Sequence, residues 1–227
     1  MAPFGKIHSY PSNFRALRAL IIADLNGLEI EIPPFTMSET NRTPEFLAKF
    51  PLGKIPAFEG ADGFLLTESI AIATYIAKSG PKAGQLLGAD AQSQAKITQW
   101  TVFTETELFS TGFVPLAMTI LGVIPLDVKR FNDSMASFDR NLKFIEVSLK
   151  GRKKHLVGDT MTLADLMITS FFYYGFKYMV GAEERKALPN LTAYVQHYAA
   201  LPEFKKHYGE LELCKNRVTT ETQKEEN

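Results

Sequence analysis

The 227-residue chain is poor in cysteine and has no excess of charge of either sign. Its one cysteine, Cys214, excludes an intramolecular disulfide framework, a Cys-x-x-Cys redox pair and a thiolate zinc site. A chain with one thiol suits a reducing compartment, so we expect a cytoplasmic protein. Twenty-five Lys and Arg balance twenty-five Asp and Glu, which excludes the broad positive field of non-specific nucleic-acid binding. Small molecules or proteins are the expected partners, not nucleic acid.

Long apolar runs and clustered histidines are also lacking. The longest apolar candidate, residues 114–126, is too short and too interrupted by proline to span a bilayer, and the start of the chain lacks a signal-peptide core. The four histidines are scattered, with no partner at metal-ligand spacing, and no glycine-rich phosphate loop stands out. We therefore expect no membrane association, no metal and no nucleotide.

The first third of the chain alternates strand and helix patterns. A short strand is predicted near residues 6–10, and the helix after it has apolar residues at every third or fourth position. Strict alternation predicts a second strand at 28–32, and the runs 55–59 and 64–67 flank a turn-rich segment, as in a hairpin. With two further helices, the predicted order over residues 1–79 is β-α-β-α-β-β-α.

Two local motifs mark helix starts. Thr43-Pro44-Glu45 combines an N-cap candidate, a proline at the first helical position and an acid in the first turn. Thr162-Leu163-Ala164-Asp165 is a close variant of a capping box in front of an apolar run. We expect a short helix after Thr43 and a buried helix after Thr162.

The rest of the chain is predicted to be helical. Prolines and glycines fall between the segments with helical periodicity, which are 91–121, 126–149, 162–179, 189–200 and 202–208. The segment after residue 79 has the composition of a linker, and the end of the chain is polar and is expected to be mobile. The predicted organisation is an α/β domain at 1–79, a linker at 80–90, an all-α domain at 91–212 and a polar tail at 213–227.

This organisation resembles that of the cytosolic glutathione transferases, with a thioredoxin-like domain followed by an all-helical domain. The greatest likeness is to the transferase-like N-terminal region of the gamma subunit of translation elongation factor one. It is carried by the stretches 41–47, 50–60 and 63–72, beginning with Asn41-Arg42-Thr43-Pro44-Glu45-Phe46-Leu47. Gly158-Asp159-Thr160-Met161-Thr162-Leu163-Ala164-Asp165 resembles the family's helix-capping motif in the second domain.

The resemblance implies a glutathione site in the first domain. A cis peptide bond between Ile55 and Pro56 would present the backbone of Ile55 to the extended tripeptide. The start of a helix at Glu68-Ser69 favours the α-carboxylate of glutathione, and Glu68 is suited to its ammonium group. Lys54 is a candidate for the glycine carboxylate. The alternatives are a plain helix cap at Glu68-Ser69 and a solvated loop lysine at Lys54.

Relatives activate the thiol with a hydroxyl or a cysteine in the loop after the first strand. This loop has no cysteine, which disfavours the thioltransferase and dehydroascorbate-reductase branches. Tyr10 and Ser12 rank together as catalytic candidates, followed by Ser9; Asn13 and Arg15 are second-choice site residues. The alternative is that Ser12 and Asn13 are ordinary helix caps and that Tyr10 packs at the end of a strand.

For the electrophile, the resemblance points to the first long helix of the all-α domain. Its candidates are Phe103, Glu107, Phe109 and Phe113, although such stripes are more often core. The implied function is a detoxifying glutathione transferase that conjugates the glutathione thiolate to small hydrophobic electrophiles. The implied assembly is a homodimer with Phe50 and Pro51 as contact candidates. The alternative is an elongation-factor-one-gamma-like module that docks a translation elongation factor partner.

Overall fold

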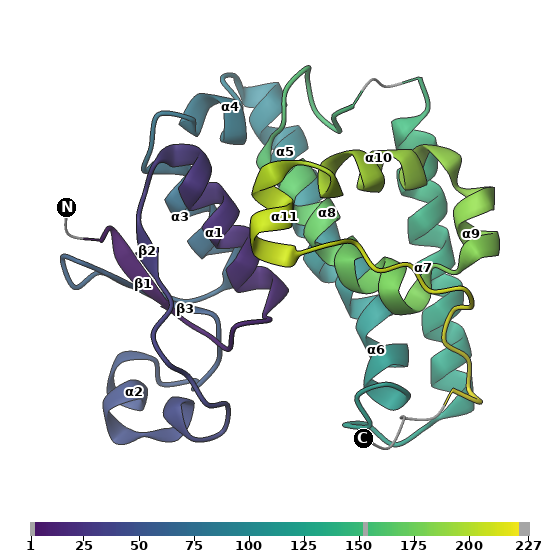
Figure 1. Cartoon of the computed structure of the whole chain (residues 1–227), viewed down its shortest axis with the longest axis horizontal. Helices are drawn as coiled ribbons and strands as arrows, with labels where there is room; N and C mark the ends of the chain where they lie inside the picture. Colours follow the sequence, from purple (N-terminus) through teal and green to yellow (C-terminus); the bar gives the residue numbers. More distant parts are fainter. Residues whose placement is uncertain (1–2, 152–153, 223–227) are drawn as a thin grey trace. The chain divides into compact units, whose positions relative to one another are not determined.

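The computed structural model describes residues 3–151 and 154–222, which form two compact units. The first unit contains residues 3–94 and 202–209, and the second contains residues 95–201 and 210–222 (Figure 1). Within the described ranges, no helix combines the length and the apolar character that crossing a membrane requires.

A four-stranded mixed sheet forms the centre of the first unit, with the strand order β2-β1-β3-β4. Strand β1 is parallel to β2 and antiparallel to β3, and β3 pairs with β4 in an antiparallel hairpin. The strands are β1 (Gly5–His8), β2 (Ile30–Glu31), β3 (Ala57–Gly60) and β4 (Leu65–Leu66). The predicted order β-α-β-α-β-β-α is confirmed.

The helices of this unit begin where local sequence signals place them. Helices α1 (Phe14–Asn26) and α3 (Ser69–Lys78) pack side by side on one side of the sheet (Figure 1). The side chain of Asn13 accepts a hydrogen bond from the Arg15 amide and caps α1, and Gly27 ends it with a φ of 66°. The Oγ1 atom of Thr43 accepts a hydrogen bond from the Phe46 amide and caps α2 (Pro44–Lys49).

Two helices of the first unit lie outside the range 1–79. Helix α4 (Ala83–Leu87) occupies part of the segment 80–90 that was expected to be a linker. Helix α11 (Pro202–Tyr208) has the predicted limits but packs against α1, so it groups with the first unit rather than with the helices that precede it (Figure 1). Its partners lie more than 180 positions earlier in the chain, and sequence periodicity carries no information about such pairing.

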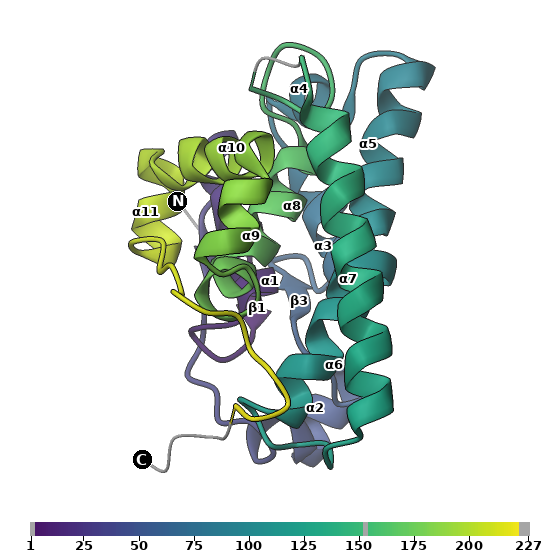
Figure 2. The same ribbon diagram turned by 90° about the vertical axis from the view of Figure 1, so that its right-hand side faces the viewer.

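The second unit is helical. Helix α7 runs beside α5 and α6 (Figure 2), and a π-helical stretch, η2, joins α5 to α6. Helix α9 is short and polar and was not predicted. The elements are α5 (Ala91–Phe103, whose start groups with the first unit), η2 (Thr104–Phe109), α6 (Ser110–Met118), α7 (Val128–Leu149), α8 (Leu163–Tyr174), η3 (Gly175–Met179, also π-helical), α9 (Ala182–Ala187) and α10 (Pro189–Ala199).

Helix α8 lies at the centre of the second unit, and nearly all its side chains are buried. The predicted capping box is confirmed, since the Thr162 amide donates to Asp165 Oδ2 at 2.8 Å. The other carboxylate oxygen accepts hydrogen bonds from the Leu156 amide (2.8 Å) and the Tyr194 hydroxyl (2.8 Å). One buried carboxylate therefore joins the start of α8, the chain before it and α10.

Part of the segment expected to be a polar tail packs against the second unit. Arg217 makes ion pairs with Asp139 on α7 (2.9 Å) and Glu184 on α9 (3.3 Å), and Val218 is buried. Sequence composition missed this contact because both acids lie far away along the chain. The sequence predicts that residues 219–227 are mobile. Of these, residues 223–227 lie outside the described residues.

Candidate functional site

The loop between β1 and α1 presents the two first-ranked hydroxyl candidates to solvent. The Asn13 amide donates to the Tyr10 carbonyl at 3.2 Å, so residues 10–13 form a tight turn in front of the helix. The side chain of Tyr10 is 39% exposed, and Ser12 is exposed as well. Both hydroxyls therefore lie within a few residues of the positive end of α1, and the structure keeps both as candidates.

The other loop residues have different surroundings. Ser9 is fully buried, and its hydroxyl has no hydrogen-bond partner among residues 3–151 and 154–222. The side-chain oxygen of Asn13 is engaged in capping α1, and the guanidinium of Arg15 lies over the Phe14 ring, 4.8 Å from its centroid. The burial of Ser9 makes it a poor donor to a ligand that approaches from solvent.

The segment before β3 has the geometry that the resemblance implies. The Ile55–Pro56 peptide bond is cis. Lys54 is exposed, Pro56 is buried, and Ile55 packs against a small core made of Phe46, Phe50 and Ala57. Phe50 is only 2% exposed, so its ring is not available for contact with a second copy. The Ile55 backbone is thus held by a packed side chain next to an exposed lysine.

Glu68 occupies the N-cap position of α3 in an unusual backbone conformation. Its φ is +68°, a conformation that costs free energy in a residue other than glycine, and its side chain makes no capping hydrogen bond. The carboxylate is exposed, directly before the first residue of α3, Ser69. Strain of this kind is found where a backbone is held for function. The exposed Glu68 carboxylate and the Ser69 hydroxyl remain the predicted ligand contacts at the start of α3.

Arg18 is a residue of this region that the sequence reasoning missed. It lies on α1, is fully buried, and its Nη2 donates to the Ser69 hydroxyl at 3.3 Å. Buried guanidinium groups need partners because removing the charge from water is costly. The available signal was its position, since Arg18 lies four residues after Phe14 and three before Ile21, on the buried side of the helix. A buried cation thus fixes the hydroxyl at the start of α3.

The four residues predicted to contact an electrophile do not form one wall. Phe103 contacts Trp100 and Phe144, with ring centroids 5.6 and 5.2 Å away. Phe109 and Phe113 stack on each other at 5.2 Å, and Glu107 is exposed. The π-helical stretch Thr104–Phe109 changes the helical register between Phe103 and Phe113, which the spacing argument could not anticipate. The structure brings together only Phe109 and Phe113.

A thioredoxin-like sheet with a cis-proline before β3, a strained Glu68 before α3 and a separate helical unit together define a chain of the glutathione transferase type. In the described ranges, no group of three or more His, Cys, Asp or Glu side chains is placed to hold a metal ion.

Comparison with known proteins agrees with this class. The family model for the glutathione S-transferase N-terminal domain matches residues 4–78, and the model for the C-terminal domain matches residues 128–202. The chain is 45% identical over 209 residues to the glutathione S-transferase-like protein LUC7 of Fusarium sp, covering 92% of this chain and 94% of that protein. The chain belongs to the glutathione S-transferase family and has its fold.

The elongation-factor branch of the family is similar as well. Elongation factor 1-gamma of Rattus norvegicus is 34% identical over an alignment of 228 positions, which covers 97% of this chain and 50% of that protein. This chain therefore spans about half the length of the elongation factors that it matches. The crystal structure of the glutathione-transferase-like domain of elongation factor 1-gamma from Saccharomyces cerevisiae superposes with a TM-score of 0.80 at 25% identity and covers 96% of this chain and 99% of that one.

Proposed function

We propose that the protein is a glutathione transferase that conjugates the glutathione thiolate to small hydrophobic electrophiles. The observation that carries the proposal is the arrangement at the start of α3, where an exposed, strained Glu68 stands beside a Ser69 hydroxyl held by the buried Arg18. A capping role accounts for neither the strain nor the buried cation. A ligand with both a carboxylate and an ammonium group matches the Ser69 hydroxyl and the exposed Glu68 carboxylate.

In this proposal each end of glutathione has its own group on the first unit. Ser69 and the backbone amides at the start of α3 bind the α-carboxylate, and Glu68 binds the ammonium group. The Ile55 backbone pairs with the extended middle of the tripeptide, and Lys54 binds the glycine carboxylate. Together, Lys54, Ile55, Pro56, Glu68 and Ser69 are the proposed glutathione-binding residues.

The thiol is proposed to lie near the start of α1, next to Tyr10 or Ser12. An ordinary thiol has a pKa of about 8.5, so only a few per cent of the thiol groups are ionised to thiolate at neutral pH. Lowering that pKa by about two units makes the thiolate dominant and requires the site to stabilise the thiolate by roughly 2.7 kcal/mol relative to the thiol. A hydroxyl donor and the helix dipole are the groups that supply this stabilisation.

The remaining assignments follow from the family. The stacked pair Phe109 and Phe113 is the proposed contribution of the second unit to electrophile binding. A cytoplasmic, detoxifying role and a homodimer are part of the same proposal; exposed Pro51, rather than buried Phe50, is the available contact candidate. Residues 1–79 and 91–212 are the proposed limits of the two domains.

A second candidate function is a docking module of the elongation-factor-one-gamma type. The observation in its favour is the 34% identity to elongation factor 1-gamma over 97% of the chain. On this alternative the chain binds a translation elongation factor partner, and the glutathione site is a remnant. The two functions differ in whether a bound thiol is ionised.

The deciding experiment is a calorimetric titration of glutathione into the purified protein, with the ultraviolet thiolate absorbance followed against pH. The proposal expects binding and a thiol pKa well below about 8.5. Tyr10→Phe and Ser12→Ala then identify the donor, because the correct change restores an ordinary thiol pKa. Absence of binding at millimolar glutathione would reject the transferase and favour the docking module.

A further inference from the structure

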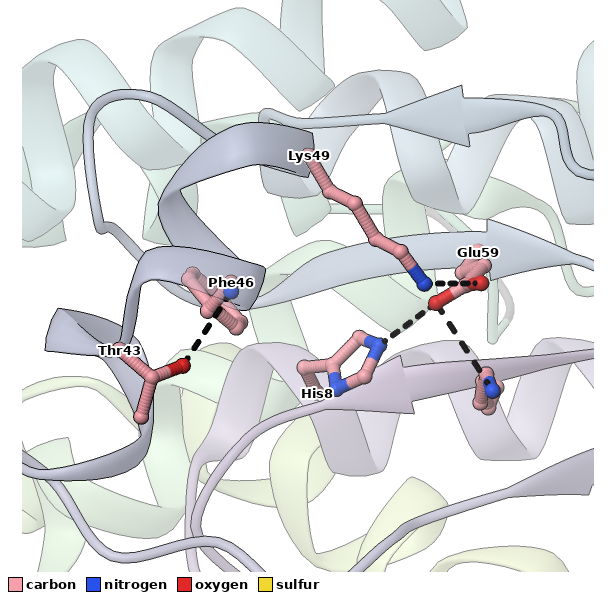
Figure 3. A network of polar contacts seen from close by, with 6 residues as sticks. His8, Thr43, Phe46, Lys49 and Glu59 are labelled. Atoms are coloured by element: carbon pink, nitrogen blue, oxygen red, sulfur yellow. Dashed lines mark hydrogen bonds and ion pairs between the residues drawn. The ribbon is translucent and has the colours of Figure 1, made fainter.

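A cluster of charged residues lies on the first unit, outside the proposed glutathione-binding residues (Figure 3). Glu59 on β3 has a largely buried side chain, 14% exposed. Its Oε1 accepts a hydrogen bond from Lys49 at the end of α2 at 2.6 Å. Its Oε2 interacts with His8 on β1 at 3.2 Å and with Lys6 on β1 at 3.8 Å. Figure 3 shows Lys49 and His8 reaching Glu59 from α2 and β1.

An aromatic layer continues from this cluster. The His8 ring meets Phe46 edge-on at 5.6 Å and lies 5.8 Å from Phe50. Phe46 and Phe50 contact each other at 5.2 Å, and Ile55 packs against the core that they form with Ala57. Glu59 is thus connected through Lys49 to α2, and through His8 to the aromatic core against which Ile55 packs.

Helix α2 has little stability of its own. It has six residues, of which only Phe46 is buried. A helix this short is not stable in isolation, because nucleation costs more than so few hydrogen bonds return. Contacts with the rest of the first unit, including the 3₁₀ turn Thr40–Arg42, therefore set its position, and the Lys49–Glu59 ion pair is a charged contact with β3.

We propose that Lys49 is a positioning residue for glutathione binding: its ion pair with Glu59 holds α2 on the sheet, and through the Phe46–Phe50 core it holds the Ile55 backbone where the tripeptide pairs. The inference rests on the proposed glutathione site. It assigns the ion pair to ligand affinity and not to the chemistry of the thiol, because neither Lys49 nor Glu59 belongs to the loop after β1.

The chain offers a matched control for this pair. Lys6 and Lys49 approach the same carboxylate, but Lys6 lies on β1 and Lys49 on α2. Lys49→Gln removes the positive charge near Oε1 of Glu59, and Lys6→Gln removes the positive charge near Oε2. Lys49→Arg keeps the charge and is the rescue variant. Hydrogen exchange at the Leu47, Phe50 and Gly53 amides, which bond within this segment, reports on α2.

Lys49→Gln is expected to weaken glutathione binding by about two- to fivefold, with Lys6→Gln changing it by less than about twofold. The thiol pKa of the bound glutathione is expected to stay unchanged in both. Exchange at the three reporter amides is expected to accelerate in Lys49→Gln only, and Lys49→Arg is expected to restore both affinity and protection.

Equal effects of Lys49→Gln and Lys6→Gln on affinity would overturn the assignment, as would a shift in the thiol pKa. Wild-type protein that does not bind glutathione would reject the proposed function and the ligand-affinity part of this inference. The exchange comparison would then still decide whether Lys49 holds α2 in place, since that measurement needs no ligand.

Discussion

The hydroxyl of Tyr208 donates a hydrogen bond of 2.5 Å to the backbone carbonyl of Phe14. This contact ties the last helix, α11, to the first residue of α1, next to the loop that holds the candidate thiol donors. Asp24 at the other end of α1 binds Lys206 at 2.6 Å and His207 at 2.7 Å. Residues of α11 therefore contact both ends of the helix on which the candidate site is built.

Tyr208→Phe is expected to lower the free energy of unfolding by about 1 kcal/mol, because it removes one part-buried hydrogen bond and keeps the ring. Urea denaturation measures the change. Tyr75→Phe is the matched control: its ring packs against Phe4 and Phe58, and the described residues provide no hydrogen bond to its hydroxyl. Equal losses in the two variants would contradict the importance of the Phe14 contact.

Asp165→Ala is expected to destabilise the protein by about 3 to 5 kcal/mol. The change leaves the Leu156 and Thr162 amides and the Tyr194 hydroxyl without their buried acceptor. Asp159→Ala, at an exposed position in the same segment, is the control and is expected to change stability by less than about 0.5 kcal/mol. Thermal unfolding of both variants gives the comparison, and a stable Asp165→Ala protein would contradict it.

Ser69 and Arg18 are expected to act together in ligand binding. Ser69→Ala removes a hydroxyl and is expected to weaken glutathione binding by about tenfold, or about 1.4 kcal/mol. Arg18→Lys keeps the charge but replaces the guanidinium that donates to that hydroxyl. If Arg18 orients Ser69, the double variant loses less affinity than the sum of the single losses. Strict additivity in a calorimetric double-mutant cycle would show that the two residues act independently.

Acid is expected to destabilise the protein in two steps. Burial lowers the pKa of His8 below its usual 6.5, although Glu59 opposes that shift. The unfolded chain then takes up its proton first, so stability is full above about pH 6.5 and falls as the pH drops toward the folded-state pKa. The hydrogen bond from Lys49 lowers the pKa of Glu59 below 4.5. Its contribution is present above about pH 4.5 and is lost as the pH falls through the folded-state value.

Free energies of unfolding, measured by denaturation from pH 3 to pH 8, test both steps. Each unit of difference between the folded and unfolded pKa corresponds to about 1.4 kcal/mol. His8→Gln is expected to flatten the profile just below about pH 6.5 and to leave the lower step in place. An unchanged upper slope in His8→Gln would show that another group causes it.

Helix starts were predictable because their signals are local. Asn13, Thr43 and Thr162 each cap a helix through contacts with residues two or three positions away, and all three motifs are visible in the sequence. The long amphipathic helix α7 and the apolar helix α8 were also predicted, since their periodicity extends over many turns. The short helices α4 and α9 were missed because five or six residues give too little periodicity.

The candidate site was predictable only in part. Ile55-Pro56 and Glu68-Ser69 were located through a family resemblance, and the structure adds the cis bond and the strained Glu68 backbone. The burial of Arg18 and its contact with Ser69 depend on the packing of α1 against α3, 51 positions apart in the chain. The electrophile candidates stay a prediction, and the structure adds that η2 interrupts the regular helix between Phe103 and Phe113.

The sequence by itself determined the balanced charge, the order of strands and helices and the positions of the helix caps, because each depends on composition or on residues a few positions apart. Tertiary structure alone decided that α11 belongs with α1, that Arg217 holds the segment after α11, and that Glu59 gathers Lys6, His8 and Lys49. These contacts join residues distant in the chain, and only folding brings their charged groups within a few ångströms of one another, where their attraction becomes appreciable.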